Sequence, residues 1–186
     1  MKIGVDIDGV VADFVGSFLP ELNKYCNCSS EDIVNYDFEK NIKINITDSQ
    51  NKELWGIINK NKLYSKLKLI KGCEIALSDI IKNNSIILIS SRKKEIRGDT
   101  LAWLKKYKIS FSKLKLFDSK KEKIKAMSKC DIVLEDDLEV ARALSALDVQ
   151  VLLFDYPWNR IGSNIKRIKS WGQALKIIKR PMVSSV

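Results

Sequence analysis

The chain has 186 residues, of which 45% are hydrophobic and three are prolines, enough apolar material to bury the core of one globular domain and to carry a modest insertion. Its 33 lysines and arginines outnumber its 23 aspartates and glutamates, and the net charge of +10 suits an anionic partner such as a phosphorylated metabolite, a nucleic acid or an acidic surface. Histidine is absent, which excludes the commonest general base and the commonest metal ligand and leaves acid–base chemistry to carboxylates, lysine, cysteine or tyrosine.

Cysteine usage and the N-terminus predict a cytoplasmic protein. The four cysteines show none of the paired C-x-x-C spacing of a zinc site, and we interpret them as reduced thiols. The chain passes from Met1 and Lys2 straight into an apolar strand without the longer apolar region of a signal peptide, and no apolar run approaches the ~20 residues of a membrane-spanning helix. Secretion and membrane insertion are therefore not expected. The cysteines are Cys26, Cys28, Cys73 and Cys130.

Short apolar runs recur along the chain and are typical of strands that a parallel sheet buries on both faces. The segments between them have helical spacing, and SKKEKIKAM at 119–127 opens with a capping box that has Ser119 as N-cap and Glu122 at N3. RPMVSSV at 180–186 is expected to be a frayed tail. The alternation of strands and helices implies right-handed crossovers. We therefore expect an open, Rossmann-like α/β sheet. The runs are KIGVDI at 2–7, SIILIS at 85–90, KLKLF at 113–117, DIVLE at 131–135 and VQVLLF at 149–154.

One interval breaks this alternation and predicts a helical cap. Between the first strand and SIILIS lie roughly seventy residues with helical spacing and no convincing strand, far more than one crossover helix requires. We expect a cap over 15–83, inserted after the first strand, and a core domain formed by 1–14 and 84–186. The expected cap helices cover about 15–27, 30–35, 48–61 and 73–83.

Polar residues cluster at the ends of the predicted strands, where an open α/β sheet binds its ligands. Two aspartates close the first strand, and burying two like charges so near each other costs several kcal/mol unless a cation or a proton relieves them. Several carboxylates, a hydroxyl group and a lysine on one rim suit a hard divalent cation together with a phosphate. The candidates are Asp6 and Asp8 after the first strand, Ser90, Ser91 and Arg92 after the second, Glu135, Asp136 and Asp137 after the fourth, and Lys120 and Lys121 at the start of the preceding helix.

Four segments, in order, carry a family resemblance. DIDGVVADF at 6–14, ILISSR at 87–92, the helix start at Lys121 and IVLEDD at 132–137 resemble the four motifs of the haloacid dehalogenase (HAD) superfamily of phosphotransferases. The resemblance covers nearly the whole chain, including a helical cap between the first two motifs. Finer features, such as LEDDLEVA and FDYPWNR, are similar to bacterial nucleotidases grouped with the 5'(3')-deoxyribonucleotidases.

The resemblance implies roles for the carboxylates. Asp6 would be the nucleophile that forms an aspartyl-phosphate, and Asp8 would protonate the leaving oxygen and then activate water. Asp6, the backbone carbonyl of Asp8, Glu135 and Asp136 would hold Mg²⁺. Glu135 stands where many relatives have the shorter aspartate, so its contact with the metal is direct or through water.

It also implies a substrate-binding set. Ser90 would donate a hydrogen bond to the phosphoryl group, with Ser91 and Arg92 beside it, and Lys121 would pair with the phosphoryl group. Lys120 competes with Lys121, which is preferred because its spacing to the fourth motif better matches the relatives.

Some candidates have a purely structural alternative. Asp137 is expected only to cap the following helix. Arg92 fits either a second substrate anion or an ion pair. Phe14 and Trp158 fit either stacking on a base or simple packing.

The function implied is a Mg²⁺-dependent phosphomonoesterase for a small phosphate ester, a 5'- or 3'-(deoxy)nucleotide, with a sugar or other metabolite phosphatase as the alternative. A receiver-like signalling domain is a distant alternative, since its acceptor aspartate would follow a central strand and a cap would have no purpose there. A nucleic-acid polymer is not an expected partner, because no aromatic-interleaved basic motif or zinc finger is present. The oligomeric state is left open.

Overall fold

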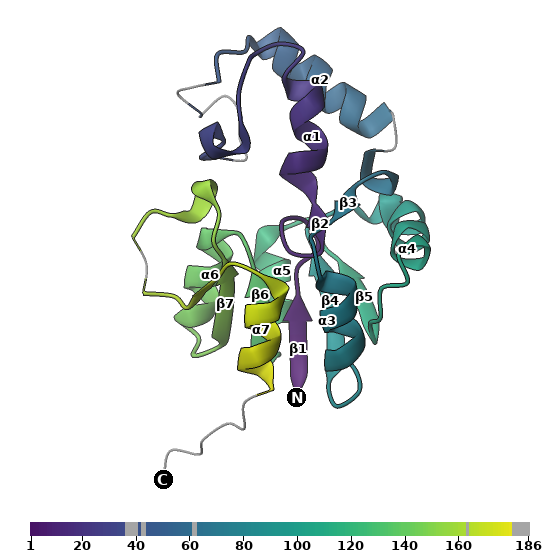
Figure 1. Ribbon diagram of the computed structural model, residues 1–186, viewed down its shortest axis with the longest axis vertical. Helices are drawn as coiled ribbons and strands as arrows, with labels where there is room; N and C mark the ends of the chain where they lie inside the picture. The colour runs from purple at the N-terminus through teal and green to yellow at the C-terminus, as the bar shows by residue number, and fades with distance from the viewer. Residues whose placement is uncertain (36–40, 42–43, 61–62, 163, 180–186) are drawn as a thin grey trace.

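The computed structural model describes residues 1–35, 41, 44–60, 63–162 and 164–179 and divides them into an α/β body and a smaller group of helices above it (Figure 1). The body contains a six-stranded parallel sheet with strand order β5-β4-β1-β6-β7-β8. This confirms the predicted α/β fold, although the short last strand was not expected. The strands are β1 (Lys2–Val5), β4 (Ser85–Ser90), β5 (Lys113–Leu116), β6 (Ile132–Glu135), β7 (Gln150–Phe154) and β8 (Arg167–Ile168).

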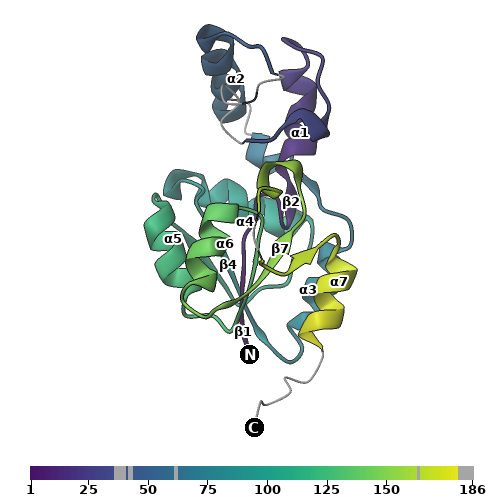
Figure 2. The same ribbon diagram turned by 90° about the vertical axis from the view of Figure 1, so that its left-hand side faces the viewer.

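Helices cover both faces of the sheet. They are α3 (Cys73–Ile80), α4 (Arg97–Lys106), α5 (Lys120–Met127), α6 (Leu138–Ser145) and α7 (Trp171–Ile178), with the 3-10 turns η4 (Lys94–Ile96) and η5 (Pro157–Asn159). Figure 2 shows α5 and α6 on one side of the sheet and α3 and α7 on the other. In β4, Ile86 and Leu88 belong to the cluster on the α3 and α7 side, whereas Ile87 and Ile89 face α5 and α6, because side chains alternate along a strand.

The same alternation directs two carboxylates toward α5. In β1, Gly4 faces Cys130 and Val133 of the α5 and α6 cluster, so Asp6, two residues further on, continues that face. In β6, Glu135 likewise follows Val133. The backbone N–H of Asp6 donates to the carbonyl of Leu134 at 3.0 Å, which places the two strand ends side by side. Register alone therefore brings Asp6 next to Glu135.

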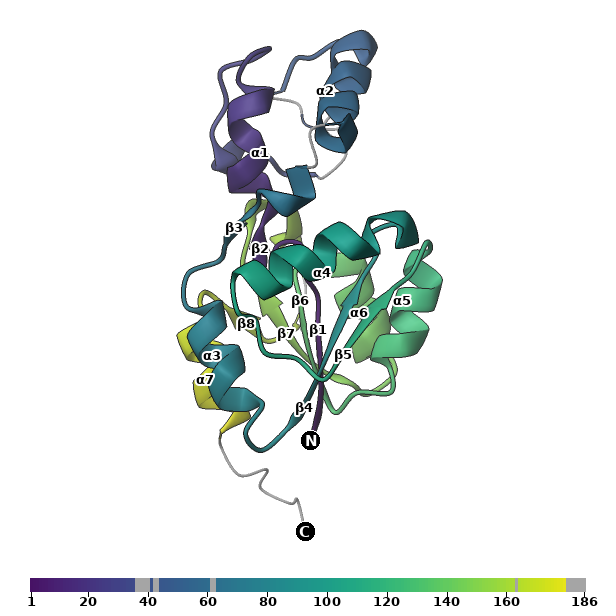
Figure 3. The ribbon, with the colours of Figure 1, turned by 90° about the vertical axis from the view of Figure 1, so that its right-hand side faces the viewer.

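The helices of the upper group, here called the helical lobe, are α1 (Phe14–Leu22), η1 (Ser30–Asp32), α2 (Asp48–Lys60) and η3 (Leu63–Ser65). The chain enters the lobe through β2 (Ala12–Asp13) and leaves it through β3 (Lys68–Leu69), which pair antiparallel. Figure 3 shows α4 beneath the segment that leads from the lobe into β3. Strands of two residues carry no periodicity, which is why the sequence did not predict this ribbon.

The helix expected at 73–83 as part of the cap lies elsewhere. In the structure α3 packs beside α7 against the sheet (Figure 1). Its buried residues, Cys73, Ala76, Leu77 and Ile80, form a stripe at the spacing of one helical face. Helical spacing shows that a segment has an apolar face but not which surface will cover it. This correction shortens the expected cap at its C-terminal end.

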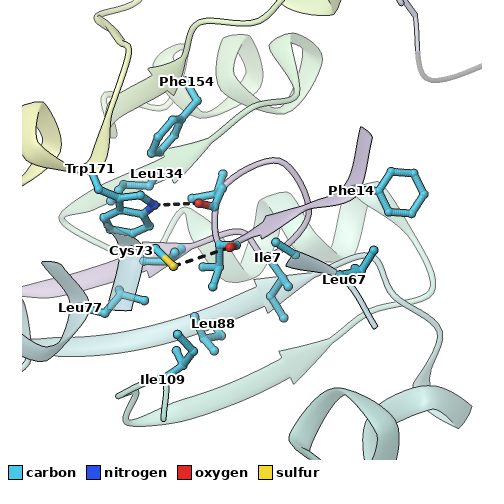
Figure 4. Close-up of a cluster of buried hydrophobic side chains, with 14 of the residues drawn as sticks. Ile7, Phe14, Leu67, Cys73, Leu77, Leu88, Ile109, Leu134, Phe154 and Trp171 are labelled. Carbon is cyan, nitrogen blue, oxygen red and sulfur yellow. Dashed lines mark hydrogen bonds between the residues drawn. The ribbon is translucent and has the colours of Figure 1, made fainter. Parts of the chain in front are cut away.

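The loop after β1 is anchored from below by these two helices. The backbone N–H groups of Val10, Val11 and Ala12 all donate to the carbonyl of Ile7, and Gly9 has a φ of 79°, which favours glycine. The indole N–H of Trp171 donates to the carbonyl of Val10 at 2.8 Å (Figure 4). Since Asp8 lies in this loop, α7 helps to fix the position of Asp8.

Two expected helix caps are confirmed. Ser119 caps α5 by accepting from the backbone N–H of Glu122, and Asp137 caps α6. The four cysteines form no disulfide. Among the described residues, no helix combines the length and the apolar character needed to cross a membrane. The expected frayed tail at 180–186 lies outside the described residues.

The anchor on the β1 loop gives a prediction. Replacing Trp171 with Phe keeps an aromatic ring but removes the N–H group, so the buried carbonyl of Val10 loses its partner. We expect Trp171→Phe to lower the free energy of unfolding by about 1–3 kcal/mol, measured by urea denaturation. An unchanged midpoint at an unchanged m-value would contradict the anchoring role.

Candidate active site

A cavity of about 250 Å³ lies at the carboxyl ends of β1, β4 and β6. It brings together most of the residues that the sequence singled out. Polar side chains line one part of it and aromatic side chains from the helical lobe line another. The polar lining residues from the predicted set are Asp6, Asp8, Ser90, Ser91, Arg92, Lys120, Asp136 and Asp137.

Three carboxylates form the most buried part of the site. Oxygen atoms of Asp6, Glu135 and Asp136 all lie within 4.8 Å of one another, and none of the three residues is more than 4% exposed. Glu135 Oε1 accepts hydrogen bonds from the backbone N–H groups of Asp136 and Asp137 at 3.2 and 3.1 Å. Such a group of like charges requires positive charge close by.

Lys123 supplies part of that charge. Its Nζ lies 3.1 Å from Asp6 Oδ1 and 3.0 Å from Glu135 Oε2, and all three side chains are almost fully buried. Although burial lowers the pKa of the Lys123 ammonium, the carboxylates of Asp6, Glu135 and Asp136 outweigh that effect and raise the pKa above its usual value. Lys123 therefore carries its charge throughout the neutral range.

The Asp6 carboxyl has a perturbed pKa. Burial raises the pKa of Asp6 well above its usual value; Lys123 opposes that rise, and the neighbouring carboxylates of Glu135, Asp136 and Asp8 add to it. One oxygen of Asp6, Oδ1, and one of Glu135, Oε2, are buried and accept no hydrogen bond from the described residues, although each lies within ion-pair distance of Lys123.

The structure places Lys123 beside Asp6, and not Lys121 as the sequence predicted. Lys121 is exposed and does not line the cavity, while Lys120 Nζ pairs with Asp137 and Glu139 at 3.0 and 2.6 Å. Lys123 lies one helical turn before Met127, and these two residues are the buried ones in α5. The sequence held this signal, because a lysine four residues before an apolar residue shares its inward face.

Asp8 forms an ion pair with Arg92, whereas Asp6 and Glu135 pair with Lys123. Arg92 donates to both Asp8 oxygens at 2.8 Å, through Nε and Nη2. Of the two alternatives for Arg92, the structure has the ion pair. The backbone N–H of Arg92 donates to Ser90 Oγ at 3.2 Å, and Ser90 is buried, whereas Ser91 is exposed at the cavity edge.

The loop that contains η5 donates two hydrogen bonds to Asp136. The indole N–H of Trp158 donates to Asp136 Oδ2 at 3.0 Å, and the fully buried Asn159 donates to the Asp136 carbonyl at 2.8 Å. The Trp158 ring stacks on Tyr156 with ring centres 4.3 Å apart. The sequence of the segment FDYPWNR does not indicate these bonds, since they join residues about twenty positions apart.

The helical lobe contributes an aromatic wall. Phe14 from α1, Trp55 from α2 and Tyr64 from η3 line the cavity. The ring centre of Phe14 lies 6.5 Å from that of Trp55 and 6.1 Å from that of Tyr64. The sequence singled out Phe14 but not Trp55 or Tyr64, whose neighbours give no sign of a site.

The chain is similar to known proteins along nearly its whole length. Residues 1–184 match the family model described as "5' nucleotidase, deoxy (Pyrimidine), cytosolic type C protein". A protein of Halalkalibacterium halodurans named "putative nucleotidase" is 29% identical over 182 residues, which cover 93% of this chain and 90% of the relative. A nucleotidase of Clostridium acetobutylicum is 27% identical over 185 residues, 97% of this chain and 94% of the relative. A HAD-like hydrolase from Streptococcus pneumoniae has the same fold, with a TM-score of 0.68 at 10% identity over 96% of this chain and 98% of that one.

The central position of Lys123 gives a prediction with a matched control. In Lys123→Met the buried carboxylates of Asp6 and Glu135 lose their ammonium, and we expect a loss of about 3–5 kcal/mol in the free energy of unfolding. Lys121→Met makes the same change on the exposed side of the same helix and should stay within about 0.5 kcal/mol of the wild type. Urea denaturation at neutral pH measures both.

The pH dependence of that loss tests its cause. Protonation of Asp6 removes a negative charge that Lys123→Met leaves uncompensated, so the difference between wild type and variant should shrink as the pH is lowered through the raised pKa of Asp6. A loss that stays constant with pH, or an equal loss in Lys121→Met, would refute the electrostatic explanation.

Proposed function

The chain belongs to the 5' nucleotidase, deoxy (pyrimidine), cytosolic type C protein family, and on that premise we propose that it is a Mg²⁺-dependent phosphomonoesterase. Its proposed substrate is a small phosphate ester, a 5'- or 3'-(deoxy)nucleotide, cleaved through an aspartyl-phosphate on Asp6. One observation carries the proposal above all. The buried Asp6, Glu135 and Asp136 cluster, with Lys123 at its centre, opens into a cavity that has an aromatic wall.

The residues of this cluster fit a divalent cation with oxygen ligands. The three carboxylates and the single ammonium leave two negative charges, which equal the charge of one Mg²⁺ in magnitude. Asp6 Oδ1 and Glu135 Oε2 are buried oxygens without a hydrogen bond from the described residues. Asp6, Glu135 and Asp136 would hold the ion, with the Asp8 carbonyl as a further ligand. When bound, Mg²⁺ would neutralise charge on the phosphoryl oxygens and help to orient them.

Asp6 is the proposed nucleophile. Its carboxylate oxygen attacks the phosphorus atom, the bond from phosphorus to the leaving oxygen breaks, and the phosphoryl group is then joined to Asp6. Lys123 favours the ionised form of Asp6 and holds the carboxylate against the end of β6. The Ser90 hydroxyl accepts a bond from the Arg92 backbone, which leaves its own O–H able to donate to the phosphoryl group.

Asp8 is the proposed proton carrier. It gives a proton to the leaving oxygen as the phosphorus–oxygen bond breaks, and it takes a proton from water as the water attacks the aspartyl-phosphate. Its side chain is 23% exposed, whereas that of Asp6 is 6% exposed. This difference suits an exchange of protons by Asp8 and a covalent role for Asp6.

The aromatic wall supports a nucleotide as the substrate. Flat rings stack favourably on planar bases, and Trp55 and Tyr64 face the same cavity as the phosphate-binding groups. A sugar phosphate has no planar ring for these side chains to cover. We propose that the helical lobe is the cap that reads the leaving group and excludes water during the reaction.

A substrate panel tests the proposed function. Hydrolysis of 5'- and 3'-nucleotides, deoxynucleotides and sugar phosphates is measured by phosphate release, with Mg²⁺, with Zn²⁺ and after chelation. We expect nucleotides to exceed sugar phosphates in kcat/KM, turnover to require Mg²⁺, and Zn²⁺ to serve poorly in a site made only of oxygen ligands. Full activity after exhaustive chelation would remove the metal from the mechanism. Equal and feeble turnover of all nucleotides would instead favour another phosphate ester.

The two aspartates of the first motif should differ when each is replaced. Asp6→Asn removes the oxygen that accepts the phosphoryl group, so turnover should fall to background. Asp8→Asn removes a proton carrier worth ~10²–10⁴-fold in rate, so measurable activity should remain, with the smallest loss for leaving groups of low pKa. Rates across a series of aryl phosphates measure this difference.

Mass spectrometry after exposure to substrate adds an independent check. A phosphorylated form should accumulate on Asp6 in Asp8→Asn, because the amide cannot activate water for the second step. Substantial turnover by Asp6→Asn, or an adduct on Asp8 in the wild type, would overturn the assignment.

A further inference from the structure

Arg92 makes the most constrained contact of the site. Its side chain is only 1% exposed, and its Nε and Nη2 groups each donate to a different oxygen of Asp8 at 2.8 Å. A two-pronged bond between a guanidinium and a carboxylate fixes the plane as well as the position of both groups. The rotation of the Asp8 carboxylate about its own axis is therefore restricted.

Arg92 is itself fixed from three directions. Its Nη1 donates to Oγ1 of the fully buried Thr100 in α4 at 3.3 Å. The guanidinium carbon lies 4.9 Å from the ring centre of Tyr64 and 5.4 Å from that of Trp103, within the range of cation–π attraction. Trp103 in turn donates through its indole N–H to the Leu67 carbonyl at 2.8 Å. The guanidinium thus has little freedom to turn toward another anion.

These contacts argue against a phosphate-binding role for Arg92. A guanidinium can receive a phosphate in a two-pronged bond on the edge of Nε and Nη2 or on the edge of its two terminal nitrogens. Here Asp8 occupies the first edge, and Nη1 of the second edge donates to Thr100. To bind the substrate phosphate on the first edge, Arg92 would have to release Asp8, the residue proposed to move the proton.

We propose that Arg92 is a positioning residue for Asp8, an inference that rests on the proposed function. Each oxygen of a carboxylate has two lone pairs, and the guanidinium uses one on each, which leaves another to face the reacting oxygen atoms. Arg92 thereby aims one Asp8 oxygen at the leaving oxygen in the first step and at the attacking water in the second. No atom is gained or lost by Arg92, and the proton passes between Asp8 and these oxygens alone.

The experiment compares Arg92→Met with Arg92→Lys across aryl phosphates of rising leaving-group pKa. Arg92→Met removes the charge and the two-pronged bond, whereas Arg92→Lys keeps the charge and loses the geometry. A misplaced reacting group can cost ~10²-fold in rate, so we expect kcat to fall by about that factor for the poorest leaving groups and by far less for the best. KM for the aryl phosphates and competitive inhibition by inorganic phosphate should stay within about twofold of the wild type.

A double-mutant cycle shows whether the effect acts through Asp8. In the Asp8→Asn background there is no proton carrier to aim, so adding Arg92→Met should change the remaining rate by less than about twofold. The control variant Arg97→Met removes an exposed arginine at the start of α4, whose Nη1 donates to the Leu114 carbonyl at 3.3 Å. It should leave both kcat and its dependence on leaving group as in the wild type.

Other outcomes would overturn the inference. If Arg92 binds the phosphate, both variants should raise KM and weaken inhibition by inorganic phosphate equally for every leaving group, and the loss should persist in Asp8→Asn. Should Arg92→Met fail to fold by circular dichroism, the dependence of Arg92→Lys on leaving group decides the matter, and a flat dependence counts against positioning. A wild type that hydrolyses no aryl phosphate would overturn the proposed function itself, whereas an active wild type with unaffected variants would overturn this inference alone.

Discussion

The burial of like charges at the adjoining ends of β1 and β6 is the constraint on which the rest of the site depends. Parallel pairing places Asp6 beside Glu135, and the alternation of side chains turns both toward α5. Two buried carboxylates so close together are stable only with a cation between them. Lys123 supplies that cation, and its position on the inner face of α5 joins the helix to the ends of β1 and β6.

The carboxylates of the site fall into two groups with separate partners. Asp8 is paired one to one with Arg92, whereas the three carboxylates of Asp6, Glu135 and Asp136 surround a single lysine. The divalent cation of the proposed mechanism would therefore be held by the second group and not by the first. In that mechanism Asp6 and Asp8 perform different chemistry although both are aspartates, because their charged partners differ.

The sequence predicted the parts of the structure that depend on local pattern. Periodicity predicted the five long strands, and local residue patterns predicted the helix caps Ser119 and Asp137. The rule that the carboxyl ends of parallel strands meet at one edge predicted that Asp6, Asp8, Ser90 and the fourth motif would lie together. What it missed depends on packing between distant segments. A single sequence does not reveal the surfaces that place α3 beside α7 or that bring Trp158 and Asn159 to Asp136. Lys123 differs from these, because its spacing to Met127 already indicates that it lies on the inward face of α5.

The strengths of the contacts between the lobe and the body differ, and this difference bears on how a substrate enters. The return segment is held firmly, because Trp103 donates to the Leu67 carbonyl in a buried setting. The far side of the lobe meets η5 through Glu31 and Arg160, 2.9 Å apart and both exposed, and such a pair contributes only about 0–1 kcal/mol. If the lobe acts as the proposed cap, its opening would cost least at the far side, with the β2 and β3 ribbon as the fixed edge. Phe14 and Tyr64 lie near that edge, whereas Trp55 lies in α2, so such an opening would shift Trp55 more than the other two rings of the aromatic wall.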